Sequence, residues 1–135
     1  LKHPHTLITN ITLFTLDRIA YIQKRNAEKK LSVYILAKID ITDRQVYAKY
    51  EEGFMAIFKR YGGRLLSVDE DPMVLEGTWP ETRTVMAEFK DKESAMKWYQ
   101  SPEYQEIVQH RLRASSADII VAQGNLEEQN GPQKI

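Results

Sequence analysis

Residues 32–41 read SVYILAKIDI, and residues 42–63 read TDRQVYAKYEEGFMAIFKRYGG. In the first segment every second residue is apolar, from Val33 to Ile41, and this period of two predicts a β-strand with one apolar face. In the second segment Thr42 or Asp43 can cap a helix, and Gly62-Gly63 can end it. Apolar residues recur at helical spacing between the caps, which predicts an amphipathic helix. Its apolar face carries Val46, Tyr47, Tyr50, Phe54, Ile57, Phe58 and Tyr61.

The chain beyond this helix continues the alternation of strands and helices. Residues 64–77 predict a strand interrupted at Asp69-Glu70-Asp71-Pro72, because Pro72 cannot donate to a ladder. Residues 83–89 predict a third strand, and 117–123 predict the last one. Between these two, Asp91 caps a short helix, and Ser101-Pro102 ends it and opens another. The order β-α-β-β-α-β predicts a ferredoxin-like α+β fold whose helices cover one face of a four-stranded antiparallel sheet.

The other face of this sheet is mixed in character. Alternation assigns it Tyr34, Leu36, Lys38 and Asp40, then Thr84, Met86 and Glu88, then Asp118, Ile120 and Ala122. Such a face is too apolar for full solvation and yet holds charges. We therefore expect a homodimer of two back-to-back sheets.

The segments together resemble one family. The resemblance is carried by Asp40-Ile41-Thr42-Asp43 with Tyr47 and Tyr50, Tyr61-Gly62-Gly63-Arg64, Leu75-Glu76-Gly77 with Trp79-Pro80, Arg83 with Glu88-Phe89, and Trp98-Tyr99 with Ser101-Pro102-Glu103-Tyr104-Gln105 and Arg111. Over about residues 32 to 123 the chain looks like the domain of unknown function 1330 family, of the dimeric α/β barrel superfamily. The resemblance implies a ferredoxin-like protomer, a dimer and a cleft between sheet and helices, but no reaction. Family members often have a Gly-Gly turn in the second strand, and this chain departs from them there, with Asp69-Glu70-Asp71-Pro72.

Composition excludes several classes of function. The 135 residues include 19 Lys plus Arg, 19 Asp plus Glu and no Cys. A net charge of zero argues against nucleic-acid binding, and the lack of Cys excludes disulfides and thiolate metal sites. His110 with Glu106 one turn earlier lacks a third ligand, so we expect a surface His, no metal and no cofactor. No segment is apolar enough for a membrane helix, and the expected location is the cytoplasm.

Charge and composition divide the chain into three parts. Residues 1–30 hold six basic and two acidic side chains, whereas residues 31–135 hold 13 basic and 17 acidic ones. We expect 1–30 to be an N-terminal extension, with helix and strand equally open. Residues 31–123 are expected to form the ferredoxin-like domain, and 124–135 a mobile C-terminal tail.

Two groups of charged residues are candidates for chemistry. Glu88 and Lys38 are expected on the open sheet face, where a partly buried Glu88 could act as acid or base. The alternative, which we favour, is an ion pair at a dimer interface. Arg83 and Arg111 could hold an anionic substrate, or instead pair with Glu76 or Glu103. Glu88 and Arg83 are thus the candidate catalytic residues.

Aromatic residues supply the candidate ligand site. Tyr47, Tyr50, Trp79, Trp98 and Tyr99 could wall an apolar pocket, although aromatic residues at helical spacing are more often core. We take Tyr47, Trp79, Trp98 and Arg111 as candidate ligand-binding residues.

Two functions remain open. The first is a dimer that binds a small organic molecule in a cleft, with metal-free acid/base chemistry as the reaction such groups would suit. That cleft is expected to be lined by Tyr47, Trp79, Arg83, Glu88, Trp98 and Arg111. The alternative is a non-catalytic regulatory or assembly module whose aromatic residues fill the core. An open cleft with Arg and Glu converging on it favours the first, and a filled one favours the second.

Overall fold

The computed structural model describes residues 3–28, 31–80 and 82–125. It divides into two compact units, of which residues 31–124 form one, and the chain on either side belongs to the other. In this second unit α1 spans His3–Glu28. Of the two structures that the sequence left open for residues 1–30, helix and strand, the described part is therefore a helix. The expected tail lies outside the described residues from 126 onward. Within the described part of the chain no helix is long and apolar enough to cross a membrane.

Residues 31–124 contain a four-stranded antiparallel sheet with the strand order β2-β3-β1-β4. The strands are β1 (Val33–Ile41), β2 (Arg64–Asp69), β3 (Arg83–Phe89) and β4 (Ser115–Gln123). β1 lies between β3 and β4 and pairs antiparallel with both. The fold is therefore ferredoxin-like, as the order of elements predicted.

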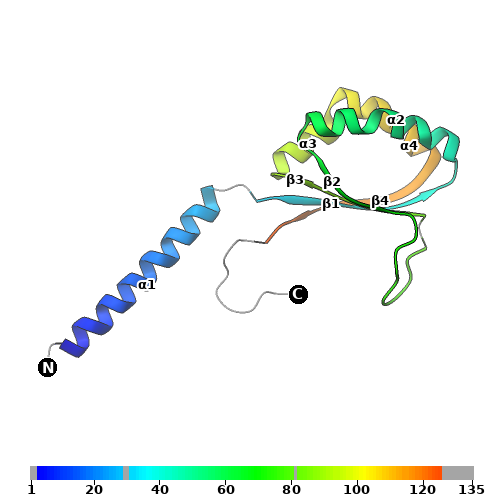
Figure 1. The fold of residues 1–135 in the computed structure, drawn as a ribbon. Helices are drawn as coiled ribbons and strands as arrows, with labels where there is room; N and C mark the ends of the chain where they lie inside the picture. The colour runs from blue at the N-terminus through cyan, green and yellow to red at the C-terminus, as the bar shows by residue number, and fades with distance from the viewer. Residues whose placement is uncertain (1–2, 29–30, 81, 126–135) are drawn as a thin grey trace. The chain divides into compact units, whose positions relative to one another are not determined.

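Three helices, α2 (Arg44–Arg60), α3 (Lys92–Gln100) and α4 (Pro102–Ala114), cover one face of this sheet (Figure 1). Their caps explain their bounds. The Asp43 side chain accepts hydrogen bonds from the backbone N–H groups of Gln45 and Val46. Asp91 caps α3 through the N–H of Ser94, and Ser101 caps α4 with Pro102 in its first turn. Of the two predicted caps of α2, Asp43 is the one used.

The second strand is shorter than the sequence predicted. β2 ends at Asp69, after an irregularity between Leu65 and Ser67, and the predicted continuation to residue 77 is wrong. The backbone turns away where the N–H of Asp71 donates to the Asp69 side chain at 2.8 Å, just before Pro72. The connection from β2 to β3 projects on the side of the sheet opposite the helices (Figure 1).

The two faces of the sheet differ as the alternation predicted. On β1 the side chains of Val33, Ile35, Ala37, Ile39 and Ile41 are all buried under the helices. Phe58 of α2 and Phe89 of β3 are fully buried and meet edge to face, with ring centroids 5.2 Å apart. Gly63 is needed beside them, because a Cβ at this position would meet the Phe58 ring at 2.5 Å. The core therefore lies between helices and sheet, and Lys38 and Glu88 lie on the open face.

Candidate functional site

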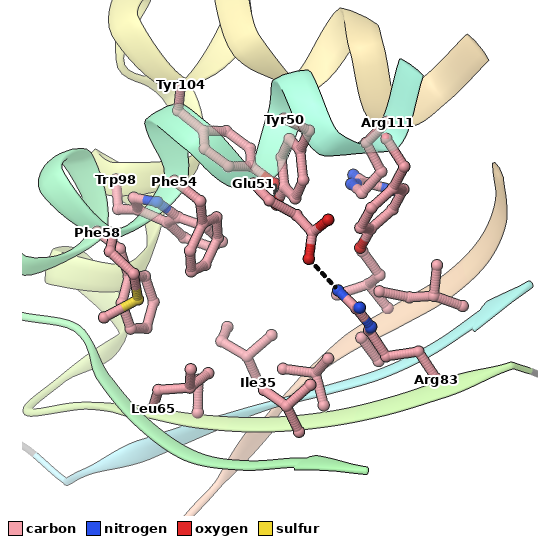
Figure 2. A pocket seen from close by; sticks show the side chains of 18 residues that line it. Ile35, Tyr50, Glu51, Phe54, Phe58, Leu65, Arg83, Trp98, Tyr104 and Arg111 are labelled. Atoms are coloured by element: carbon pink, nitrogen blue, oxygen red, sulfur yellow. Dashed lines mark hydrogen bonds and ion pairs between the residues drawn. The ribbon is translucent and has the colours of Figure 1, made fainter. Parts of the chain in front are cut away.

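A cavity of about 260 Å³ remains between the sheet and the helices (Figure 2). Its floor includes small side chains, since Ala37 and Ala87 occupy positions on the covered face of β1 and β3. Larger rings on the helices above cannot reach into all of this space. The lining comprises Ile35, Ala37, Ile39, Tyr47, Tyr50, Glu51, Phe54, Met55, Phe58, Leu65, Val68, Arg83, Val85, Ala87, Trp98, Tyr104, Arg111 and Ile119.

One end of the cavity is aromatic. Phe54 and Phe58 stack at 4.9 Å between ring centroids, and Trp98 meets Phe54 edge to face at 6.1 Å. The indole Nε1 of Trp98 is buried and has no hydrogen-bond partner among the described residues. This end offers π-faces and one unused N–H donor.

The other end holds a buried guanidinium. Arg111 of α4 is only 4% exposed, and its Nε has no hydrogen-bond partner in the described part of the chain. Its guanidinium carbon lies 5.7 Å from the centroid of the Tyr50 ring. Burial works to lower the pKa of Arg111, but the phenols of Tyr104 and Tyr50 outweigh it and the pKa is raised. The group is therefore a permanent cation.

Two phenols lie beside this cation. The hydroxyl oxygens of Tyr50 and Tyr104 are 2.9 Å apart and share a hydrogen bond. Burial raises the pKa of Tyr104 and raises that of Tyr50 well above 10.0. Both phenols are thus neutral at physiological pH and cannot act as counter-ions for Arg111.

A second arginine on the cavity wall is, in contrast, fully paired. Arg83 of β3 contacts Glu51 at 3.0 Å and Glu70 at 2.8 Å (Figure 2 shows the first contact). Glu70 also accepts from Arg44, at 2.9 Å. The pKa of Glu70 is lowered, chiefly by Arg44 and also by Arg83. The guanidinium of Arg83 lies over the Tyr47 ring, 5.1 Å from its centroid. This network links α2 to the acidic turn that follows β2.

Of the residues predicted for the pocket, the structure brings five to the cavity: Tyr47, Tyr50, Arg83, Trp98 and Arg111. Their roles remain predictions. The expected partners of the two arginines are wrong, because Arg83 pairs with Glu51 and Glu70. Glu103 binds Arg60 and Tyr61 instead.

Glu88 and Trp79 do not line the cavity, so their expected place in the cleft is wrong. Glu88 lies opposite Tyr34 on the open sheet face and forms an ion pair with Arg64 at 2.8 Å. The predicted approach of Glu88 to Lys38 is also wrong, since Lys38 lies opposite Thr84. Side-chain alternation places both on one face, but only the register shows that they are not neighbours.

Trp79 is held against the open face of the sheet. Its Nε1 donates to the Thr84 hydroxyl at 2.7 Å, and Lys38 Nζ lies 4.9 Å from the centroid of its ring. Tyr99 is 39% exposed and also lies away from the cavity.

Sequence reasoning missed Glu51 and Glu70. Glu51 stands one helical turn after Tyr47, a spacing that places both on neighbouring parts of one helix face. That spacing is the signal that could have identified it. Glu70 is near Arg83 only in space. The contact of His110 is with Arg113, at 2.8 Å. Among the residues with described positions, no three His, Asp or Glu side chains gather as a metal site would need.

Comparisons with known proteins agree on the fold. Residues 32–125 match a family model described as a domain of unknown function (DUF1330). No curated protein matches the chain significantly. A solved protein of unknown function from Rhodopseudomonas palustris superposes with a TM-score of 0.61 at 19% identity, over 81% of this chain and 92% of that one.

Two further solved structures are similar at lower identity. A variant of SnoaB, a cofactor-independent oxygenase from Streptomyces nogalater, gives a TM-score of 0.51 at 11% identity, over 72% of this chain and 98% of that one. A dimeric ferredoxin-like protein of unknown function from Bacteroides fragilis gives 0.49 at 12% identity, over 71% of this chain and 99% of that one. At 11% identity the likeness to SnoaB is one of fold alone.

Proposed function

Since this chain belongs to the DUF1330 family, defined as a domain of unknown function, we propose a function from its own cavity: it binds a small, largely apolar organic molecule between the sheet and the helices. The observation that carries this proposal is a cavity of about 260 Å³ that the aromatic core residues leave unfilled. Native cores are close-packed and rarely keep a void of this size. An unfilled cavity with a few polar groups is the usual form of a ligand site.

The size of the cavity limits the size of the ligand. An apolar cavity of about 150 Å³ takes up benzene. The present one, at about 260 Å³, therefore has room for one aromatic ring with a short substituent. The aromatic end formed by Phe54, Phe58 and Trp98 offers the ring both stacked and edge-on contacts.

The lining supports binding more than acid/base chemistry. The pKa values of the phenols of Tyr47, Tyr50 and Tyr104 are raised, chiefly by burial, so they are poor bases. The carboxylate on the wall, Glu51, is held by Arg83. Arg83 thus has a positioning role at the wall in this proposal.

Filling the cavity tests the proposal. Ala37→Leu places an isobutyl group at the cavity floor, whereas Ala56→Leu makes the same change on the exposed side of α2. Binding of a set of single-ring probes (phenol, benzamide and benzoate) is followed by ligand-observed NMR. We expect binding to the unmodified chain and to Ala56→Leu, and loss of binding in Ala37→Leu. Absence of binding by every probe would favour the regulatory or assembly module instead.

We also propose that the open sheet face joins two copies of the chain. This face carries half-exposed apolar side chains, such as Met86 at 39% and Ile120 at 57% exposure. It also carries charges of both signs, with Lys38 opposite Asp118 across the β1–β4 pair. A two-fold axis can set such charges against each other while the apolar groups are buried. The β2–β3 connection projects on the same side of the sheet (Figure 1). It carries exposed apolar residues, including Met73 and Leu75, which in this proposal contact the second copy.

The oligomeric state tests this second proposal. Light scattering is expected to return about twice the chain mass of 15.7 kDa. Ile120→Glu should reduce this to the monomer mass, because it buries a carboxylate in the interface. Leu112→Glu on α4 is a matched control, since both side chains are 57% exposed in the single chain. A monomeric parent chain, or equal effects of the two variants, would refute the interface.

A further inference from the structure

Arg111 is a buried charged group for which the described residues supply no opposite charge. It is 4% exposed, lines the cavity and leaves its Nε without a hydrogen-bond partner among the residues described. In the described part of the chain no carboxylate forms an ion pair with it. Buried charges in proteins are nearly always paired with an opposite charge. Among the described residues, therefore, this buried cation has no counter-ion.

The neighbours of Arg111 do not supply that counter-ion. The facing phenols of Tyr50 and Tyr104 are neutral, because burial raises their pKa values. The Tyr50 ring gives a cation–π contact, and the last turn of α4 favours positive charge. These contacts, together with the phenols of Tyr104 and Tyr50 that raise the pKa of Arg111, offset the cost of burial without neutralising the charge. Figure 2 shows the guanidinium of Arg111 beside Tyr50, on the cavity side of its helix.

The other arginine of the cavity provides an internal comparison. Arg83 is held by two carboxylates, Glu51 and Glu70, so its charge is already balanced. A ligand anion at Arg83 would have to displace one of them. At Arg111 it would displace none, and the charge-assisted pair would form in a site shielded from water.

We propose that the ligand of this cavity is a small organic carboxylate, whose anionic group pairs with Arg111 and whose ring or short apolar chain lies at the aromatic end. This inference rests on the proposed small-molecule binding and names its substrate class. The planar fork of the guanidinium matches a carboxylate. The volume of about 260 Å³ accommodates one ring beside that group. Charge selects the ligand at one end of the cavity, and apolar contact selects it at the other.

A pair of probes of equal shape separates this inference from the proposed function. Benzoate and benzamide differ in charge while keeping the same ring, and calorimetry gives both dissociation constants. We expect benzoate to bind the unmodified chain about tenfold or more tightly than benzamide. Equal binding of the two would refute the carboxylate and leave small-molecule binding intact. Failure of both, and of every other single-ring probe, would refute both proposals.

Two variants then test whether Arg111 is responsible for the preference for benzoate over benzamide. Arg111→Gln should remove the preference for benzoate and leave the affinity for benzamide within about threefold, because only the charged contact is lost. Arg113→Gln changes an exposed arginine two residues later on the same helix, and it should keep the preference. A preference that persists in Arg111→Gln would refute the assignment. The comparison of probes on the unmodified chain stands even where that variant fails to fold.

Discussion

Replacing Arg111 with Met asks whether the buried cation serves a ligand or the fold. Met keeps an unbranched, apolar stem and removes the charge. The substitution leaves no new unpaired polar group behind, because Tyr50 and Tyr104 remain hydrogen-bonded to each other at 2.9 Å. The change in unfolding free energy therefore reports the net effect of the guanidinium.

The expected change in the free energy of unfolding follows from the surroundings of Arg111. Keeping one ion buried without a counter-ion costs several kcal/mol, here about 4 kcal/mol. The cation–π contact with Tyr50 offsets about 2 kcal/mol. The position in the last turn of α4 offsets about 0.5–1 kcal/mol more. The phenols of Tyr104 and Tyr50 offset the rest, which is why the pKa of Arg111 is raised. The Met side chain has no charge to compensate and gains from the burial of its own apolar atoms, so we expect Arg111→Met to stabilise the unliganded protein by about 1 kcal/mol.

Thermal unfolding of the parent chain and of Arg111→Met, both without ligand, measures this change in stability. For a domain of this size about 1 kcal/mol corresponds to a rise in Tm of about 4–8 °C. Arg113→Met, an exposed change on the same helix, should stay within about 0.5 kcal/mol of the parent. A loss of more than about 2 kcal/mol in Arg111→Met would show that the cation holds the fold together, and the reasoning that it awaits a ligand would fail.

Three further outcomes are expected. Phe58→Ala removes a fully buried ring and should cost about 3–5 kcal/mol in urea unfolding, and a cost below about 1 kcal/mol would contradict the packing described. Burial raises the pKa of Tyr50 well above 10.0, so in alkali the phenol ionises first in the unfolded chain. The stability that the neutral phenol contributes is then fully present below about pH 10 and falls as the pH rises above that value. Urea unfolding midpoints at about pH 8 and about pH 11 measure this loss, and equal midpoints would contradict the burial of Tyr50. Glu88→Gln should leave benzoate affinity unchanged, because Glu88 lies on the open face beside Arg64, and a calorimetric change above about threefold would contradict that placement.

Local physics made the elements of this fold predictable. Four signals depend only on near neighbours in the chain: the alternation in β1, the cap at Asp43, the Ser101-Pro102 start of α4 and the glycines after α2. The shape of the second strand was harder to predict. Asp69-Glu70-Asp71-Pro72 was interpreted as an interruption, whereas the strand ends there, because the Asp71 N–H turns back to the Asp69 side chain.

The candidate site was predictable only in part. Tyr47, Trp98 and Arg111 reach the cavity because helical periodicity assigns them to faces turned toward the sheet. Glu88 and Trp79 were expected with them and lie on the opposite side. The alternation of β3 places Glu88 on the open face, and this is incompatible with a place in a cleft beneath the helices.

The sequence alone determines three features of this protein: the βαββαβ order, the helix caps, and the division of each strand into an apolar and a mixed face. These features depend only on the spacing of residues along the chain. Tertiary structure decided that Ala37 and Ala87 leave a space beneath the rings of α2. It also decided that Glu51 and Glu70 neutralise Arg83, while no carboxylate of the described residues pairs with Arg111. The physical reason is that a void and a missing counter-ion depend on which side chains from distant segments meet, and no local pattern encodes that meeting.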